Sequence, residues 1–140
     1  MALLLDHVQE SCSGAVALPV ARVDLWKRRW RGVAADGTEV AVALAEAARD
    51  GQCLAGGGRC FLIKQREEEL VVIPLPPEVD MAAKIGWYLG NRHIPIEVRG
   101  SMMLMENFPT LTDSLTRIGI RYHLKVDVLA CRPHSADHRH

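Results

Sequence analysis

Prolines crowd one short stretch of this chain, and the hydrophobic pattern differs on its two sides. Pro74, Pro76 and Pro77 fall within four residues of a 140-residue sequence. Proline lacks the backbone N–H that a strand ladder or a helix interior requires, so neither element continues through this stretch. A proline-rich segment also acts as a semi-rigid spacer. We therefore expect two domains, one covering residues 1–73 and the other residues 74–130.

The first part has the short apolar runs and turn residues of a β domain. Residues 15–20 and 21–26 are apolar-rich and short, which predicts strands. Asp36-Gly37 stands between alternating apolar positions, a sequence typical of a hairpin turn. Three successive glycines at 56–58 mark a further break. Such frequent breaks favour a small sheet or sandwich over helices.

The second part changes to a helical period. From Pro77 to Leu89, apolar and small residues recur three or four positions apart, which predicts a helix that Gly90 stops. Residues 94–98 and 101–105 follow, and each has the apolar pattern of a strand.

A second helix and a last strand complete the pattern. Asn107 is expected to cap a helix with an apolar stripe, and Gly119 to end it. Residues 122–128 alternate as a final strand. If residues 69–73 join this part as its first strand, the order becomes βαββαβ, the ferredoxin-like pattern. The predicted fold class is α+β, with a small N-terminal β domain followed by a ferredoxin-like C-terminal domain.

Charge and composition exclude several classes of protein. Seventeen basic and seventeen acidic residues leave no net charge, whereas a nucleic-acid binder needs a basic excess. No apolar run approaches the ~20 residues of a membrane span, and no basic leader precedes one. The cysteines (Cys12, Cys53, Cys60 and Cys131) lack CxxC spacing and fit reduced thiols. We expect a cytoplasmic protein that binds neither nucleic acid nor membrane.

Catalytic motifs are missing from the sequence. It contains no nucleophile elbow, no phosphate-cradling glycine loop and no HExxH. We therefore expect no enzyme. One alternative from a different class stays open, a non-catalytic adaptor in a metalloenzyme maturation complex. Its β domain would bind a peptide strand through a surface of Trp26 and Trp30, and any metal binding would be incidental.

His93 is the first candidate metal ligand, because it follows the predicted helix at a helix-to-strand junction. Imidazole suits nickel, copper and zinc, but one imidazole alone binds any of them weakly. A two-fold homodimer would bring two copies together and supply a pair. The open alternative is a structural histidine satisfied by hydrogen bonds.

The chain ends in a segment, residues 131–140, that carries three histidines: His134, His138 and His140. Short His-rich tracts are candidates for metal binding. The alternative is a terminus that tolerates polar residues of any kind. We expect a mobile tail whose imidazoles complete an open coordination shell, while a role for Cys131 stays open.

Residues 88–93 (YLGNRH) and 94–96 (IPI) resemble the signature of the UreE family of nickel metallochaperones. Residues 28–31, 35–40 and 49–51 are similar to the first domain of that family. The resemblance implies that His93 is the central nickel ligand, contributed by both subunits at the face of a homodimer. It also implies a His-rich tail, which is present here in short form.

The resemblance further implies an activity and partners. Such proteins deliver Ni²⁺ to apo-urease through a complex with the urease accessory GTPase, without catalytic turnover. Zn²⁺ and Cu²⁺ would also bind a histidine site in vitro. The first domain of the family resembles a peptide-binding module of co-chaperones. Many members carry an Asp-His element where this chain has Asn107, Phe108 and Pro109, so the resemblance implies that this accessory site is absent.

Overall fold

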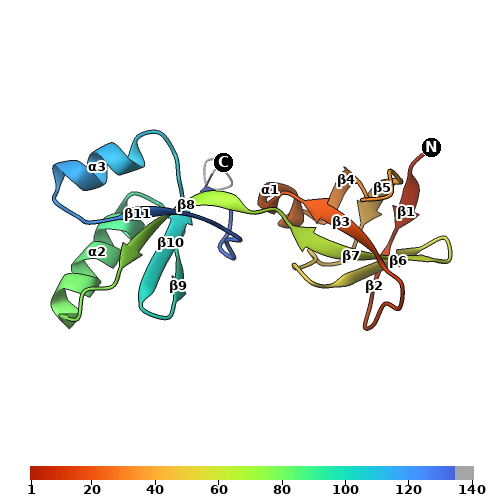
Figure 1. Cartoon of the computed structure of the whole chain (residues 1–140), viewed down its shortest axis with the longest axis horizontal. Helices are drawn as coiled ribbons and strands as arrows, with labels where there is room; N and C mark the ends of the chain where they lie inside the picture. Colours follow the sequence, from red (N-terminus) through yellow and green to blue (C-terminus); the bar gives the residue numbers. More distant parts are fainter. Residues whose placement is uncertain (135–140) are drawn as a thin grey trace. The chain divides into compact units, whose positions relative to one another are not determined.

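The computed structural model of the chain describes residues 1–134 and divides into two compact units between Arg66 and Glu67. Strands and helices both occur, so the predicted α+β class is confirmed (Figure 1). Among residues 1–134, none of the helices combines the length and apolar composition needed to cross a membrane.

The first unit consists of two sheets and one helical turn. Its elements are β1 (Leu3–Leu5), β2 (His7–Gln9), β3 (Val16–Val20), α1 (Arg22–Leu25), β4 (Arg29–Val33), β5 (Glu39–Ala43), β6 (Cys53–Gly56) and β7 (Arg59–Gln65). One sheet has the strand order β1-β5-β4 and the other β2-β6-β7-β3. The pairs β1–β5 and β3–β7 are parallel, and the other pairs are antiparallel.

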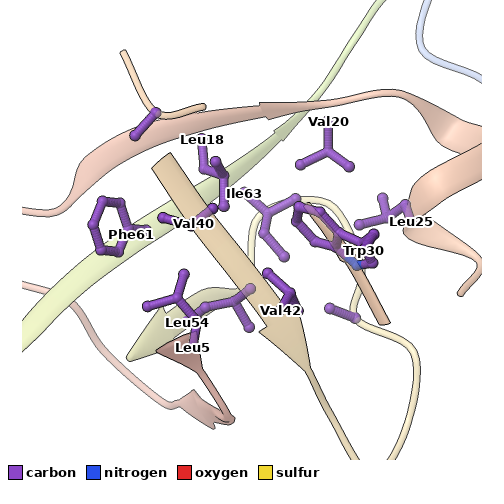
Figure 2. Close-up of a cluster of buried hydrophobic side chains, with 12 residues drawn as sticks. Leu5, Leu18, Val20, Leu25, Trp30, Val40, Val42, Leu54, Phe61 and Ile63 are labelled. Atoms are coloured by element: carbon purple, nitrogen blue, oxygen red, sulfur yellow. The ribbon is translucent and has the colours of Figure 1, made fainter. Parts of the chain in front are cut away.

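Both sheets of the first unit contribute to one apolar core (Figure 2). Alternate residues of β5 and β7 point into it, namely Val40, Val42, Phe61 and Ile63. Complete burial of such a side chain stabilises a fold by about 1.5–3 kcal/mol. The residues in between point to the opposite faces of the two strands, away from this core.

Residues 21–26 contain a helical turn, so the strand predicted there is wrong. Helix α1, Arg22–Leu25, turns the side chain of Leu25 into the core. It leaves Trp26 52% exposed, whereas Trp30 is only 7% exposed. The surface of Trp26 and Trp30 expected for an adaptor therefore does not exist, because Trp30 belongs to the core.

The second unit has one four-stranded antiparallel sheet and two helices. Its elements are β8 (Glu68–Pro74), α2 (Val79–Asn91), β9 (Glu97–Arg99), β10 (Met102–Glu106), α3 (Leu111–Arg117) and β11 (His123–Asp127). The strand order is β11-β8-β10-β9, which places β8 in the interior with a partner on each side.

The two faces of this sheet bury different groups of side chains. On one face, residues of β8 and β10 pack against both helices: Val71, Ile73, Met103, Met105, Leu89, Leu111 and Leu115. On the other face, a smaller cluster joins the sheet to the chain after β11: Leu70, Val72, Leu104 and Leu129. Strand β8 therefore contributes to both cores.

The strand before the prolines belongs to the second unit, so the predicted boundary after residue 73 is displaced. The joint between the units is Arg66–Glu67. The proline stretch instead connects β8 to α2. Proline does end the preceding element as expected, but that element is a strand in the middle of the second sheet.

Two further element ends differ from the prediction. The strand after α2 begins at Glu97, because Ile94 packs into the helix-covered core before the strand starts. Helix α3 has Thr110 as its N-cap, so Asn107 caps nothing. The Asn107 side chain instead donates to a carboxylate oxygen of Glu69 at 2.8 Å.

A fragment of residues 67–140 should fold alone, whereas residues 75–140 should not. The shorter fragment lacks β8, whose residues 70–73 are all buried. Far-UV circular dichroism and urea unfolding measure this, since a folded domain unfolds cooperatively. Cooperative unfolding of residues 75–140 would contradict the central role of β8.

Candidate metal centre

Helix α2 ends in a chain reversal that places His93 at the surface. The His93 N–H donates to the Gly90 carbonyl, and the Ile94 N–H to the Leu89 carbonyl, both at 3.0 Å. This pair of bonds is a Schellman motif, in which the residue after the C-cap adopts a left-handed conformation. His93 is that residue, with φ of 59°. Gly90, predicted to stop the helix, lies inside α2 instead.

The left-handed backbone of His93 is unusual because glycine normally takes this position. A side chain there costs on the order of 1 kcal/mol, although histidine tolerates it better than most residues. Helix α3 ends in the same way. The Gly119 N–H donates to the Thr116 carbonyl at 3.1 Å, and the Ile120 N–H donates to the Leu115 carbonyl at 2.9 Å. There the left-handed residue is a glycine, with φ of 78°, whereas His93 is the one non-glycine residue of positive φ among residues 1–134.

Buried neighbours hold the backbone of His93 in this conformation. Leu89 and Ile94 both pack into the core between the helices and the sheet, while the His93 side chain is exposed. Strained backbone geometry persists only where surrounding packing enforces it, and it concentrates at functional positions. The imidazole therefore enters solvent from a rigidly held point of attachment.

Helix α2 also carries exposed aromatic surface. Nη1 of Arg92 donates to the Tyr88 hydroxyl at 2.7 Å, and the guanidinium carbon lies 5.6 Å from the centre of the Tyr88 ring. The Trp87 side chain is 71% exposed. Tryptophan, tyrosine and arginine are the residue types enriched in protein interfaces, so this end of α2 has the composition of a contact surface.

The described residues of a single chain do not supply a full set of metal ligands around His93. Among residues 1–134, the group of three or more potential ligands close enough to hold an ion is Cys12, Cys53 and Cys60. His93 belongs to no such group among residues 1–134. Two predicted tail ligands, His138 and His140, lie outside the described residues.

The chain after β11 packs on the sheet face opposite the helices. Leu129 is fully buried against Leu70, Val72 and Leu104. Cys131 is partly buried at the margin of the same cluster. This packing fixes the point from which the histidine-containing tail begins.

Arg99 holds this segment through a set of charged hydrogen bonds. Its guanidinium donates to Asp127 at 2.9 Å and to the Val128 carbonyl at 2.7 Å. It also donates to both Glu97 oxygens, at 2.8 and 3.0 Å, and Glu97 in turn accepts from the Ala130 N–H at 2.8 Å. The Arg99 hydrogen bonds lower the pKa of Glu97. The Val128 N–H is the main cause that lowers the pKa of Asp127.

His134, the last described residue, stacks on Phe108. The two ring centres are 4.7 Å apart and the ring planes differ by 13°. Phe108 is one of the residues that, by the family resemblance, stand where many members carry an Asp-His element. A tail imidazole therefore lies against that position, although His134 and His93 share no group of three ligands among residues 1–134.

The cysteines are arranged differently from the expected set of reduced thiols. Cys12 and Cys60, 48 positions apart, form a disulfide with Cα atoms 6.1 Å apart. The Cys53 sulfur lies within 4.8 Å of both. The glycines at 56–58, which turn a hairpin, are a sequence signal that Cys53 and Cys60 lie close together. That hairpin places Cys53 and Cys60 diagonally on one sheet face, whereas nothing in the sequence brought Cys12 to them.

The fold and the surface histidine define an α+β protein that presents an imidazole from a left-handed helix end. Residues 68–140 match the family model for the C-terminal domain of the UreE urease accessory protein. The chain belongs to the UreE family. The family is one of accessory proteins and not of enzymes.

Relatives named Urease accessory protein UreE match part of this chain. Those of Burkholderia mallei (strain SAVP1) and Burkholderia pseudomallei (strain 1710b) are each 31% identical over 107 residues, which is 75% of this chain and 53% of the relative. That of Burkholderia thailandensis (strain ATCC 700388 / DSM 13276 / CCUG 48851 / CIP 106301 / E264) is 33% identical over 85 residues, 59% of this chain and 40% of the relative. The chain spans about half the length of the curated relatives it matches.

Replacing His93 with glycine should stabilise the protein by about 1 kcal/mol, because glycine removes the steric cost of the left-handed conformation. Gly119→Ala, at the equivalent position of α3, should destabilise it by a similar amount. Urea unfolding of both variants measures these changes. A less stable His93→Gly variant would show that the imidazole itself supports the fold.

Replacing Glu97 with glutamine should destabilise the fold at neutral pH and matter less in acid. The pKa of Glu97 is lowered in the folded protein, so its carboxylate stabilises the fold above the ordinary glutamate pKa. That contribution is lost as the pH falls through the lowered value. Urea unfolding at neutral and acid pH measures the difference. Glu78→Gln is the control, since its exposed side chain makes no capping bond; an equal effect there would contradict the assignment to the Arg99 contacts.

Proposed function

We propose that this chain is a cytoplasmic, nickel-binding metallochaperone whose homodimer holds Ni²⁺ between two copies of His93. It would deliver this ion for assembly of the urease active site. The observation that carries the proposal is the left-handed conformation of His93. Glycine at this position would make the helix end more stable, so stability of the fold does not explain a histidine there. We attribute the histidine at this position to the ability of its exposed imidazole to bind a metal ion.

The chemistry of one exposed imidazole suits a transferable ion. Nickel accepts imidazole nitrogen readily, and Zn²⁺ and Cu²⁺ accept it as well. A two-fold axis next to His93 brings two imidazoles to one point without another ligand from the described chain. Such an incomplete ligand set leaves positions open, whereas a closed four-ligand site holds its metal permanently. Open positions allow the acceptor protein to take over the ion.

The surface of α2 supports dimer formation through this end of the helix. Trp87 is exposed, and the Arg92–Tyr88 pair is already ordered by its hydrogen bond. Side chains ordered before association lose less entropy when the interface forms. Within this proposal, the tail histidines, His134, His138 and His140, act as additional ligands that are offered to the ion from the anchored C-terminal segment.

The partners in this proposal are the urease accessory GTPase and apo-urease. The support is family membership together with the names of the relatives. The βαββαβ order and the strand order β11-β8-β10-β9 support a ferredoxin-like second domain. The first unit, with two sheets around its own core, would act as a β domain that contacts the urease assembly.

Nickel titration by calorimetry tests the central claim. The parent should bind about one Ni²⁺ tightly per two chains, and His93→Gly should lose that site. Because glycine is expected to stabilise this helix end, the loss would not reflect unfolding. Light scattering of the same samples gives the mass of the dimer.

A transposed variant controls for histidine content. His93→Gly combined with Gly119→His keeps six histidines and places one imidazole in the same local conformation at the end of α3. This variant should not recover the tight site. If His93→Gly binds nickel as the parent does, the carrier function is wrong, and an adaptor role with incidental metal binding replaces it.

A further inference from the structure

Three sulfur atoms meet on the outer face of a sheet in the first unit. Cys53 on β6 and Cys60 on β7 lie on the face opposite Leu54 and Phe61, which point into the core. The loop between β2 and β3 brings Cys12 to the same place, and all three sulfur atoms lie within 4.8 Å of one another. Cys53 is buried, although it does not belong to the apolar core cluster that the two sheets share. The three cysteine side chains are therefore gathered at a place separate from the apolar core, with Cys53 buried and Cys12 and Cys60 partly buried.

We propose that these three cysteines, when reduced, form a binding site for a monovalent copper ion. Thiolate sulfur selects soft ions such as Cu⁺ and Zn²⁺. Metal–sulfur bonds of about 2.3 Å require sulfur atoms about 4 Å apart around one ion, which small side-chain movements achieve here. Among residues 1–134 no carboxylate or imidazole joins this group. Three donors suffice for Cu⁺, whereas structural zinc sites take four protein ligands.

The disulfide between Cys12 and Cys60 closes this site. A dithiol reductant opens it by thiol–disulfide exchange: the dithiol becomes a cyclic disulfide, and Cys12 and Cys60 each gain a thiol proton. Cu⁺ then binds as the thiols of the three cysteines release their protons to solvent. No change in the oxidation state of copper is involved. In a reducing compartment the open form predominates, because disulfides rarely persist there.

Copper competition on the full chain tests this site. The chain is reduced with dithiothreitol, freed of reductant without oxygen, and offered Cu⁺ from its bathocuproine disulfonate complex. The reduced parent should remove about one Cu⁺ per chain from the chelator, as the three-thiolate geometry requires. X-ray absorption should report about three sulfur neighbours. The oxidised parent should remove at least tenfold less.

Matched variants separate this site from other donors. Cys12→Ser, in a partly exposed loop position, and Cys53→Ala should each abolish tight Cu⁺ binding, with circular dichroism used to verify the fold. Cys131→Ser removes a cysteine from the other unit and should bind like the parent, as should His93→Gly. Unchanged binding in folded Cys12→Ser, nitrogen-only coordination, or equal binding by the oxidised chain would overturn the proposal.

Discussion

Burying Leu89 and Ile94 in one core forces the chain to reverse over the four residues between them. The reversal leaves two amide groups that find carbonyl partners inside α2, and it requires one left-handed residue, His93. Because Ile94 is anchored in the core, the following strand β9 starts only at Glu97. The same packing that closes the helix thus positions the candidate ligand and sets the beginning of the neighbouring strand.

The ends of α2 and α3 form a natural comparison within one domain. Their hydrogen-bond patterns are the same, but one uses glycine and the other histidine. Proteins keep residues that are suboptimal for stability where function requires them. The second unit tolerates this cost because β8 contributes to cores on both faces of its sheet. The Arg99 contacts add further restraint at the opposite face.

Sequence patterns were most informative where local chemistry decides the structure. Asp36-Gly37 and Gly119 turn the chain at the predicted places, since each supplies a left-handed glycine. The prediction that Gly90 stops the helix is wrong, because packing of Ile94 in the core moves the chain reversal three residues further along the chain. The turn at α1 and the approach of Cys12 to Cys60 depend on contacts between distant segments, which one sequence does not reveal. The motif of residues 88–93 predicts His93 as a candidate ligand, but it does not predict the left-handed conformation of this residue.

The two proposed sites differ in the softness of their donors. A pair of imidazoles binds Cu²⁺ more tightly than Ni²⁺ by the Irving–Williams order, so affinity alone does not protect a nickel carrier from copper. Reducing conditions, however, convert copper to Cu⁺ and also open a disulfide such as that of Cys12 and Cys60. Sulfur donors then compete for copper in a form that imidazole holds less well. On these proposals, one chain separates the two metals by donor type, with nitrogen at the end of α2 and sulfur on the sheet of the first unit.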